Sequence, residues 1–319
     1  MIRRWRRLAA EALDRRFGPL NARLDALEAR QAARFDGQAA QLDGQAAQLE
    51  QLAAQLAGAI ETVSATQASV EALRSVLRTL AADDPGHRRR LHHLRAEPGY
   101  TSAWDEPNPL VTISIPTRDR PRVLVERSLA SALAQTHEHL EVLVIGDAAG
   151  PEVAAAVEGV GDPRVRFVNL THRFARDDGE HWLTAQTLPR NEAYRLAGGR
   201  WLVDLDDDDA LRPQAVAQLL AHAREERLEV AYGMLEAHDP DGSTKPLGGF
   251  PPELGRFHWQ GAVVHAGLRF FAREHVASDL GWPGDWFRVQ RMLRAGVRIG
   301  QLDQVTCDYY PSLRWEDED

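Results

Sequence analysis

Apolar residues recur at strict seven-residue intervals in the first quarter of the chain. This period, with a second apolar position three residues on, is typical of the a/d seam of a coiled coil. We therefore predict a coiled coil over residues 20–80 and expect homo-oligomerisation through it, because an isolated seam needs a partner. A single helix folded back on the rest of the chain is the alternative. The first series is Phe35, Leu42, Leu49, Leu56, Val63, Val70 and Leu77, and Leu52, Leu73 and Leu80 follow members of it by three residues.

Two shorter segments flank the predicted coiled coil. Residues 1–19 combine six arginines with scattered apolar residues and end at Gly18 and Pro19, which predicts a short basic amphipathic helix. Such a helix can contact an anionic membrane surface, and a solvated helix end is the alternative interpretation. Residues 81–108 contain the turn-forming sequence Asp-Pro-Gly and two further prolines, which predicts a linker.

From Leu110 the pattern changes to short β-branched runs that alternate with helical segments. Strand–helix alternation predicts an α/β fold over residues 109–310, with a mostly parallel, Rossmann-like sheet and helices on both faces. Ligands of such sheets bind at the carboxyl ends of the strands. Residues 311–319 form an acidic tail. The expected strands are Val111–Ile115, Leu140–Ile145, Val165–Asn169 and Trp201–Leu205, and the expected helices include Arg122–Gln135 and Pro189–Leu196.

Composition narrows the class of protein. The 319 residues carry a formal net charge of -9, which does not favour nucleic acid as a partner. Cys307 is the one cysteine, so neither an intrachain disulfide nor a zinc–thiolate cluster can form. No run of about 18 apolar residues is present, so no transmembrane helix is predicted. We expect a cytoplasmic location, with peripheral contact at the inner face of the cell membrane through residues 1–16.

Five carboxylates stand within the six residues Asp204 to Asp209, directly after a predicted buried strand. Carboxylates this crowded repel one another and raise each other's pKa unless a cation is present. Carboxylate oxygens suit Mg²⁺ or Mn²⁺, and such an ion can bridge the protein to a diphosphate. A solvated acidic turn in which Asp209 caps the following helix is the alternative. The position at a strand end favours the metal–diphosphate interpretation.

Four segments in order resemble the catalytic domain of glycosyltransferase family 2, which has the GT-A fold. They are VTISIPTRDRP at 111–121, SLASALAQTHEHLEVLVIGDA at 128–148, PRNEAYRLAGGRWLVDLDDDD at 189–209 and GDWFRVQRML at 284–293. The resemblance spans about 200 residues, and the ordered combination is more specific than any one motif. It implies transfer of a sugar from a nucleotide-diphosphate donor to a hydroxyl of a glycan, lipid-linked or protein acceptor, in a process such as polysaccharide biosynthesis.

The resemblance also implies roles for individual residues. Asp206 and Asp208 match the DxD motif of the family and are expected to bind Mn²⁺ or Mg²⁺, with Asp208 the more direct ligand. Asp204 is assigned to the strand, and Asp209 to loop orientation or helix capping. The donor-binding residues implied by the resemblance are Pro116, Thr117, Arg118, Asp147, Arg190, Asn191, Asp206 and Asp207.

Asp285 resembles the catalytic base of the family. A carboxylate at this position can take the proton of the acceptor hydroxyl, and a base opposite a metal-held leaving group inverts the anomeric centre. Its other interpretation is a helix N-cap. The sequence departs from the family at Gly284 and Gly146, where many members carry an acid. These two glycines keep open a second function, a coiled-coil scaffold with a catalytically weak domain that binds a nucleotide or glycan.

Overall fold

The computed structural model describes residues 2–172 and 183–311, and the side chains of residues 2–17 lie outside that description. Contacts divide the chain into two compact units, Met1–Glu71 and Ala72–Asp319. The helices are α1 (Ile2–Ala96), α2 (Ser102–Asp105), α3 (Pro121–Val123), η1 (Leu124–Leu129), α4 (Ala130–Leu133), α5 (Pro151–Val160), α6 (Thr187–Leu196), α7 (Ala215–Glu225), η3 (Ala266–Phe270), η4 (His275–Leu280) and α8 (Gly284–Ala295). The strands are β1 (Val111–Thr117), β2 (Leu140–Gly146), β3 (Val165–Asn169), β4 (Trp201–Asp204), β5 (Ala210–Leu211), β6 (Val230–His238), β7 (Thr244–Leu247), β8 (Ala262–His265) and β9 (Ile299–Tyr309).

The second unit is built on one mixed sheet in the order β3-β2-β1-β4-β8-β6-β9-β5, with β7 paired to β6. β3, β2, β1 and β4 are parallel neighbours, as the alternation of strands and helices predicts. Beyond β4 the sheet becomes mixed, because β8 enters antiparallel between β4 and β6. The predicted fold class is therefore confirmed, and its parallel part is the half that carries the carboxylate run.

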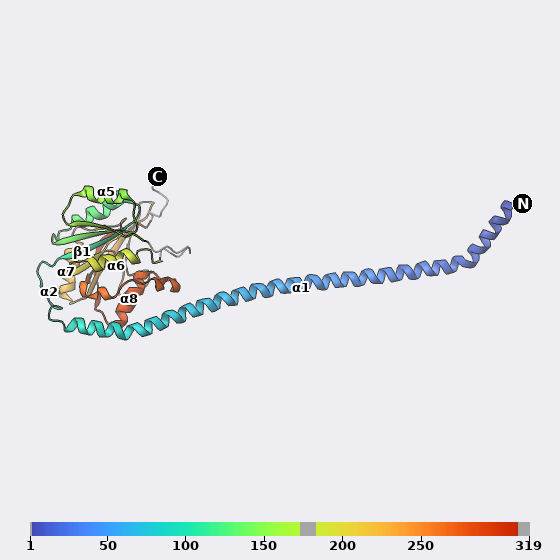
Figure 1. Cartoon of the computed structure of the whole chain (residues 1–319), viewed down its shortest axis with the longest axis horizontal. Coiled ribbons are helices and arrows are strands. Elements are labelled where there is room, and N and C mark those ends of the chain that lie inside the picture. Colours follow the sequence, from blue (N-terminus) through green and yellow to red (C-terminus); the bar gives the residue numbers. More distant parts are fainter. Residues whose placement is uncertain (1, 173–182, 312–319) are drawn as a thin grey trace. The chain divides into compact units, whose positions relative to one another are not determined.

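Both faces of the sheet are covered by helices, and side chains on alternate positions of a strand enter different cores. Val142 and Val144 of β2 belong to the core that includes α5 and α7, whereas Leu143 and Ile145 belong to the core that includes α6 and α8. In Figure 1, α5 lies on one side of the sheet and α6 and α8 lie on the other. Burial on both faces explains why the parallel strands are continuous apolar runs in the sequence.

The first unit consists of the amino-terminal part of α1. The heptad residues predicted from Phe35 to Leu77 are solvent-exposed, from 44% at Val70 to 67% at Leu49. An apolar row this exposed along one helix needs a further chain or surface to cover it. The basic side chains of residues 1–16 are not described, and their membrane contact stays a prediction. No described helix is both long and apolar enough to cross a bilayer.

The segment 81–108, predicted to be a linker, is helical as far as Ala96, so that prediction is wrong in its first half. Packing explains the difference, since Leu91 is buried in the core below α8 and His87 stacks on Phe271 with ring centroids 4.8 Å apart. Arg294 of α8 donates to Asp84, with 2.9 Å between Nε and Oδ2. Tertiary contacts of this kind override the weak helix propensity of an Asp-Pro-Gly sequence.

Glu229, a buried glutamate at the start of β6, anchors the last turn of α1. Arg95 donates to both of its carboxylate oxygens, at 2.8 and 2.7 Å, and Tyr100 donates to it as well. Burial by itself would raise the pKa of Glu229, but the hydrogen bonds from Arg95 and Tyr100 outweigh it and lower that pKa. The carboxylate therefore stays charged and holds the end of α1 as a fixed part of the second unit.

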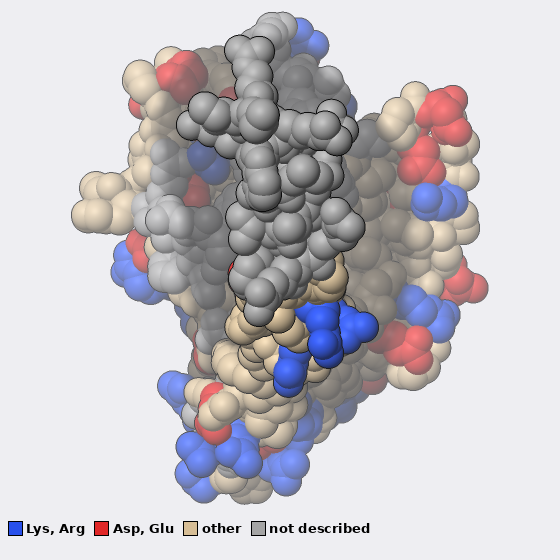
Figure 2. All heavy atoms as spheres, turned by 90° about the vertical axis from the view of Figure 1, so that its right-hand side faces the viewer, with Lys and Arg blue, Asp and Glu red and all other residues tan. Residues whose placement is uncertain are grey.

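The surface of the described residues mixes charges of both signs. Figure 2 shows blue basic and red acidic side chains close to one another on the face that it presents. Exposed ion pairs such as Arg227 with Asp105, 2.9 Å apart, are part of this mixture. The predicted acidic tail lies almost wholly in residues 312–319, outside the described part of the chain.

We predict that Glu229→Gln loosens the end of α1. Removing one member of a buried ion pair costs about 3 kcal/mol, which corresponds to about 100-fold faster amide exchange of residues that open locally. Hydrogen exchange followed by mass spectrometry on peptides covering 88–96 measures this change. The exposed neighbour Glu97→Gln is the control and should exchange like the unmodified chain. Equal protection in both variants would contradict the anchoring role.

Candidate active site

The carboxyl ends of three parallel strands meet at one edge of the sheet. Thr117 at the end of β1 pairs in register with Gly146 at the end of β2, and Ser114 pairs with Asp204 at the end of β4. The backbone of Asp147 donates to the carbonyl of Thr117 at 2.8 Å. This register brings together three polar segments that are far apart in the sequence, as the sheet predicted from the sequence requires.

A cavity of about 780 Å³ opens at this edge. A volume of this size is within the range of sites that hold a cofactor or small ligand. Part of its wall is formed by residues 183–187 and 283–286. Tyr309, the last residue of β9, and Tyr310 also line it. Eight of the residues singled out from the sequence line it, namely Pro116, Thr117, Arg118, Asp147, Asp206, Asp207, Asp208 and Asp285.

Arg190 is not among the lining residues, because it is buried beneath the carboxylate loop with 1% of its surface exposed. Its guanidinium donates to the carbonyl of Ser114 at 2.5 Å, to the carbonyl of Leu205 at 3.0 Å and to Oδ1 of Asp206 at 2.5 Å. One planar side chain thus ties the middle of β1 to the chain that leaves β4. We interpret Arg190 as a residue that positions Asp206, in place of the direct donor contact implied by the resemblance.

Asn191 also lies behind the cavity wall. Its amide group donates to the carbonyl of Arg273 at 2.9 Å and accepts from the backbone N–H of Arg273, also at 2.9 Å. This two-way hydrogen bond fixes the backbone at Arg273, which itself lines the cavity. The residue pair Arg190-Asn191, expected from the resemblance to touch the donor, therefore supports two residues that do face the cavity.

The carboxylates of the loop Asp206–Asp209 are largely buried, and this shifts the pKa values of Asp207, Asp208 and Asp209. Burial, followed by the charge of Asp208, raises the pKa of Asp207 to about 7. Burial and the charge of Asp206 also raise the pKa values of Asp208 and Asp209. Such shifts cluster at functional sites, because the strain of bringing like charges together is relieved when a cation binds.

Charged and neutral side chains of the protein already donate hydrogen bonds to the carboxylates of the loop. Arg120 donates to Oδ2 of Asp208 at 2.5 Å, and Thr117 donates to Oδ2 of Asp207 at 2.8 Å. Gln260 donates to Oδ2 of Asp206 at 2.6 Å, so both oxygens of Asp206 are engaged. Gln260 and Arg120 are site residues that sequence reasoning missed, and the arginine-rich stretch after β1 was the available signal for Arg120.

The remaining oxygens suit a divalent cation. Ligand atoms of Asp206, Asp208 and Asp209 lie within 4.8 Å of one another. Oδ2 of Asp209 is buried and has no hydrogen-bond partner among the described residues, whereas Oδ1 accepts from the backbone of Tyr310 at 3.0 Å. An orphaned carboxylate oxygen beside two other acids is the donor set that Mg²⁺ and Mn²⁺ prefer. Asp208 and Asp209 are the better placed of the three, because both oxygens of Asp206 are engaged.

Asp285 lies in the first turn of α8 and lines the same cavity as the loop. The helix cap is Pro283, so Asp285 is not the N-cap that the sequence suggested as an alternative. Trp259 donates to the carbonyl oxygen of Asp285 at 3.1 Å, which fixes the backbone there. Burial lowers the pKa of nearby His258, an effect that the charge of Asp285 partly offsets.

The two glycines at which the sequence departs from the family have separate physical explanations. A Cβ atom at Gly146 would lie 2.4 Å from Oδ1 of Asn169. Asn169 uses that space to bond both the N–H and the carbonyl of Ala149, at 3.0 and 2.8 Å. At Gly284 the nearest atoms to a Cβ would be the carbonyl of Leu183 and the hydroxyl of Thr187, at the ordinary contact distances of 3.5 and 3.6 Å. Gly146 is thus required for packing, whereas a side chain at Gly284 is sterically possible.

A buried cluster around Asp204 lies directly behind the loop. Tyr194 donates to Asp204, Arg273 donates to it at 3.1 Å, and the guanidinium groups of Arg190 and Arg288 lie 3.6 and 3.9 Å away. Burial alone would raise the pKa of Asp204, but the three arginines outweigh burial and lower it. The assignment of Asp204 to the strand agrees with its position at the end of β4, and its role as a charge centre was not foreseen.

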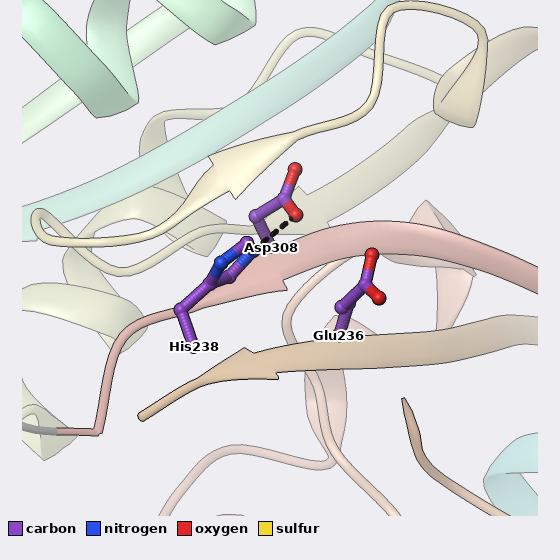
Figure 3. Close-up of side chains that lie close together, drawn as sticks. All are labelled: Glu236, His238 and Asp308. Atoms are coloured by element: carbon purple, nitrogen blue, oxygen red, sulfur yellow. Dashed lines mark hydrogen bonds and ion pairs between the residues drawn. The ribbon is translucent and has the colours of Figure 1, made fainter. Parts of the chain in front are cut away.

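A second acidic group lies on β6 and β9. Figure 3 shows Glu236, His238 and Asp308 side by side, with His238 bonded to Asp308 at 2.6 Å. Arg212 bridges the two carboxylates, at 2.5 Å from Glu236 and 2.6 Å from Asp308. A guanidinium thus already supplies positive charge between these acids. We interpret this group as an internal ion-pair network, in contrast to the loop with its orphaned oxygen.

Together the fold and the cavity are those of a glycosyltransferase of the GT-A type. The family model described as "Glycosyl transferase family 2" matches residues 112–277, just over half of the chain, and the chain belongs to this family. The GT-A resemblance and the transferase class predicted from the sequence are confirmed.

Two curated relatives and one solved structure are similar to the chain. The succinoglycan biosynthesis protein ExoO of Rhizobium meliloti is 31% identical over 120 residues, or 38% of this chain and 32% of ExoO. The putative colanic acid biosynthesis glycosyl transferase WcaA of Escherichia coli is 28% identical over 134 residues, or 41% of this chain and 43% of WcaA. The crystal structure of S. aureus TarS 1-349 in complex with UDP has a TM-score of 0.50 at 16% identity, covering 63% of this chain and 60% of that one. The matches thus span less than half the length of the two relatives, whose names connect them with polysaccharide biosynthesis.

We predict that Asp204→Asn destabilises the fold. Removing the one charge shared by three buried arginines costs about 3 to 5 kcal/mol, or roughly 10 °C in melting temperature, as followed by circular dichroism. The pKa of Asp204 is depressed, so its contribution is present above the unfolded pKa and lost as pH falls through the folded one. The difference between the variant and the unmodified chain should therefore persist at neutral pH and shrink in strong acid.

The matched control for this prediction is Asp105→Asn. It breaks an exposed ion pair with Arg227, and such pairs contribute at most about 1 kcal/mol. Equal melting temperatures of the Asp204 and Asp105 variants would refute the charge-centre role of Asp204.

Proposed function

We propose that the second unit transfers a sugar, with inversion of the anomeric centre, from a nucleotide-diphosphate donor to a hydroxyl of a glycan, lipid-linked or protein acceptor. The observation that carries the proposal is the shared cavity, whose wall contains both the loop residues Asp206–Asp208 and Asp285 of α8. Separate groups for the leaving diphosphate and for the acceptor proton are what inversion in one step requires.

The donor's nucleoside is assigned to the part of the cavity at the carboxyl ends of β1 and β2. Pro116, Thr117 and Arg118 line that side of the cavity with Asp147, whose backbone is bonded to Thr117. TarS, the solved structure similar in fold, was crystallised with UDP. A uracil base is therefore the first candidate for this chain, and the absence of a side chain at Gly146 leaves the choice between bases to Asp147 and its surroundings.

A divalent ion, Mn²⁺ or Mg²⁺, completes the donor site in this proposal. Asp208 and Asp209 would hold it, with Asp206 oriented beside them by Arg190 and Gln260. When bound, the ion supplies positive charge that stabilises the departing diphosphate. The chain's own part is to bring the acids together, to orient Asp206 through Arg190 and Gln260, and to keep the loop fixed through Thr117 and Tyr310.

Asp285 acts as the general base. It faces the cavity from α8 while its backbone is held by Trp259, and in this position it can accept the proton of an incoming hydroxyl. Gly284, the neighbour of Asp285, also lines the cavity, and the lack of a side chain there leaves that part of the wall to the acceptor. A scaffold with a catalytically weak domain has less support, because both glycines that suggested it are compatible with a complete carboxylate set.

We predict that Asp285→Asn lowers the turnover number by about 10²- to 10⁴-fold while leaving the affinity for nucleoside diphosphate intact. Asp208→Asn should instead weaken metal-dependent donor binding. A donor panel assayed with Mn²⁺, with product configuration read by NMR, measures both effects and tests inversion. The control Asp303→Asn, on an exposed part of β9, should behave like the unmodified enzyme. Full turnover in both site variants would overturn the assignment.

We further propose that the chain self-associates through the exposed heptad row of α1. The row runs from Phe35 to Leu77, for the most part within the first unit, and leaves large apolar side chains uncovered. A second copy of the same helix covers such a row by knobs-into-holes packing and repeats it in register. The repeated heptad at 36–49 supports a self-complementary surface.

We predict that replacing Leu49 and Leu56 by aspartate reduces the oligomer to monomers, since each change places a charge in the seam. Light scattering coupled to size exclusion measures the mass. The matched control replaces Ala47 and Gln51, which lie off the seam, by aspartate and should keep the oligomer. A monomeric unmodified chain would contradict this part of the proposal.

A further inference from the structure

The buried cluster behind the loop carries more positive than negative charge. Among the described residues, three arginines lie within 4 Å of two carboxylates, because Arg190, Arg273 and Arg288 share Asp204, and Arg190 also pairs with Asp206. Tyr194, the remaining polar member, has a raised pKa and stays neutral. One positive charge is therefore in excess in a place where water is scarce, which is costly unless an anion approaches.

Buried N–H groups without a hydrogen-bond partner also indicate that this cluster can bind an anion. Nε of Arg273 and both Nε and Nη2 of Arg288 are buried and lack a hydrogen-bond partner among the described residues. Arg288 is closed off, with its guanidinium packed over the rings of Tyr194 and Trp259 at 4.4 and 4.6 Å. Arg273 is the member of the trio that lines the cavity, so an anion in the cavity would meet Arg273 first.

The other arginines that line the cavity differ from Arg273 in their pairing. Arg120 and Arg118 are paired with Asp208 and Asp119, acids that line the cavity themselves. The acid that Arg273 contacts is Asp204, which is buried behind the wall and shared with two more arginines. The charge of Arg273 is therefore less neutralised on the side that faces a ligand.

The position of Arg273 is set by two independent contacts. Asn191 clamps its backbone, and Asp204 holds its guanidinium at 3.1 Å. Asp204 is in turn 3.6 Å from Arg190, which bonds Asp206 in the carboxylate loop. Burial lowers the pKa of Arg273, but Tyr194 and the carboxylates of Asp204, Asp285 and Asp206 outweigh it, so the side chain stays charged beside both halves of the site.

From these contacts we infer that Arg273 binds the β-phosphate of the nucleotide-diphosphate donor, an inference that rests on the proposed function. The loop that would hold the metal, and with it the diphosphate, is connected to Arg273 through Asp204 and Arg190. A guanidinium with an unused N–H matches a phosphate oxygen in charge and geometry. Asn191 and Asp204 are then positioning residues for this contact.

In the transfer, the bond between the anomeric carbon and the β-phosphate oxygen breaks, and its electron pair stays on the leaving nucleoside diphosphate. The acceptor oxygen forms the new bond to the anomeric carbon, and its proton passes to Asp285. Negative charge on the β-phosphate increases in this step. Arg273 offsets that increase from the protein side, so it assists departure of the diphosphate as well as binding.

The experiment compares nucleoside diphosphates with monophosphates, because the two differ by the β-phosphate alone. Isothermal titration calorimetry with Mn²⁺ present measures UDP, GDP, UMP and GMP binding to the full chain and to its Arg273→Gln, Arg273→Lys and Arg269→Gln variants. We expect Arg273→Gln to weaken diphosphate binding by about 10- to 100-fold, the effect of losing a charge-assisted hydrogen bond, and to leave monophosphate binding unchanged. Arg273→Lys should retain part of the affinity.

Arg269→Gln is the matched control, because Arg269 is exposed and does not line the cavity. It should bind all four nucleotides as the unmodified chain does. Undiminished diphosphate affinity in Arg273→Gln would overturn the inference, and so would an equal loss for monophosphates. The lysine variant guards against a folding defect, since it keeps the charge beside Asp204. If the unmodified chain binds none of the nucleotides, the proposed function itself fails along with the inference.

Discussion

The guanidinium of Arg190 joins the middle of β1 to the first residue after β4 by bonding the backbone of both. It reaches the carbonyls of Ser114 and Leu205 and the carboxylate of Asp206 with one planar group, which a lysine could not do. The carboxylate loop leaves β4 at this point, so its direction depends on this contact. The same side chain lies beside Asp204. Arg190 therefore connects the carboxylate loop, which lines the cavity, to the buried cluster around Asp204.

Charge balance explains the layout of the cavity. Burial raises the pKa values of Asp207 and Asp208 in the loop. Arg120 and Arg190 supply positive charge to the loop by bonding Asp208 and Asp206. Neither reaches the orphaned oxygen of Asp209, which is left for an external cation. Behind the loop the excess charge is positive, because three arginines share the single carboxylate of Asp204. A bound metal–diphosphate pair would supply a cation to the first region and an anion to the second.

The sequence predicts those parts of the fold that depend on local pattern. The runs that became β1, β2 and β4 are apolar and β-branched, and the carboxylate loop follows a buried strand, so the edge of the sheet that carries the site was predictable. The contacts of Gln260 and Arg273 with this edge were not, because they join positions more than 50 residues apart and leave no spacing signal. The helical state of residues 84–96 depends on burial of Leu91 and on Glu229, a partner far along the chain. Gly146, which looked like a missing acid, is explained by the side chain of Asn169.

Two acidic groups among the described residues could attract a divalent ion, and locating the ion tests the central claim most directly. We propose anomalous diffraction from crystals grown with Mn²⁺ and a nucleoside diphosphate. The account predicts a manganese peak at Asp208 and Asp209, with Arg120 no longer bonded to Asp208. A peak at Glu236, His238 and Asp308, with the carboxylate loop empty, would contradict it.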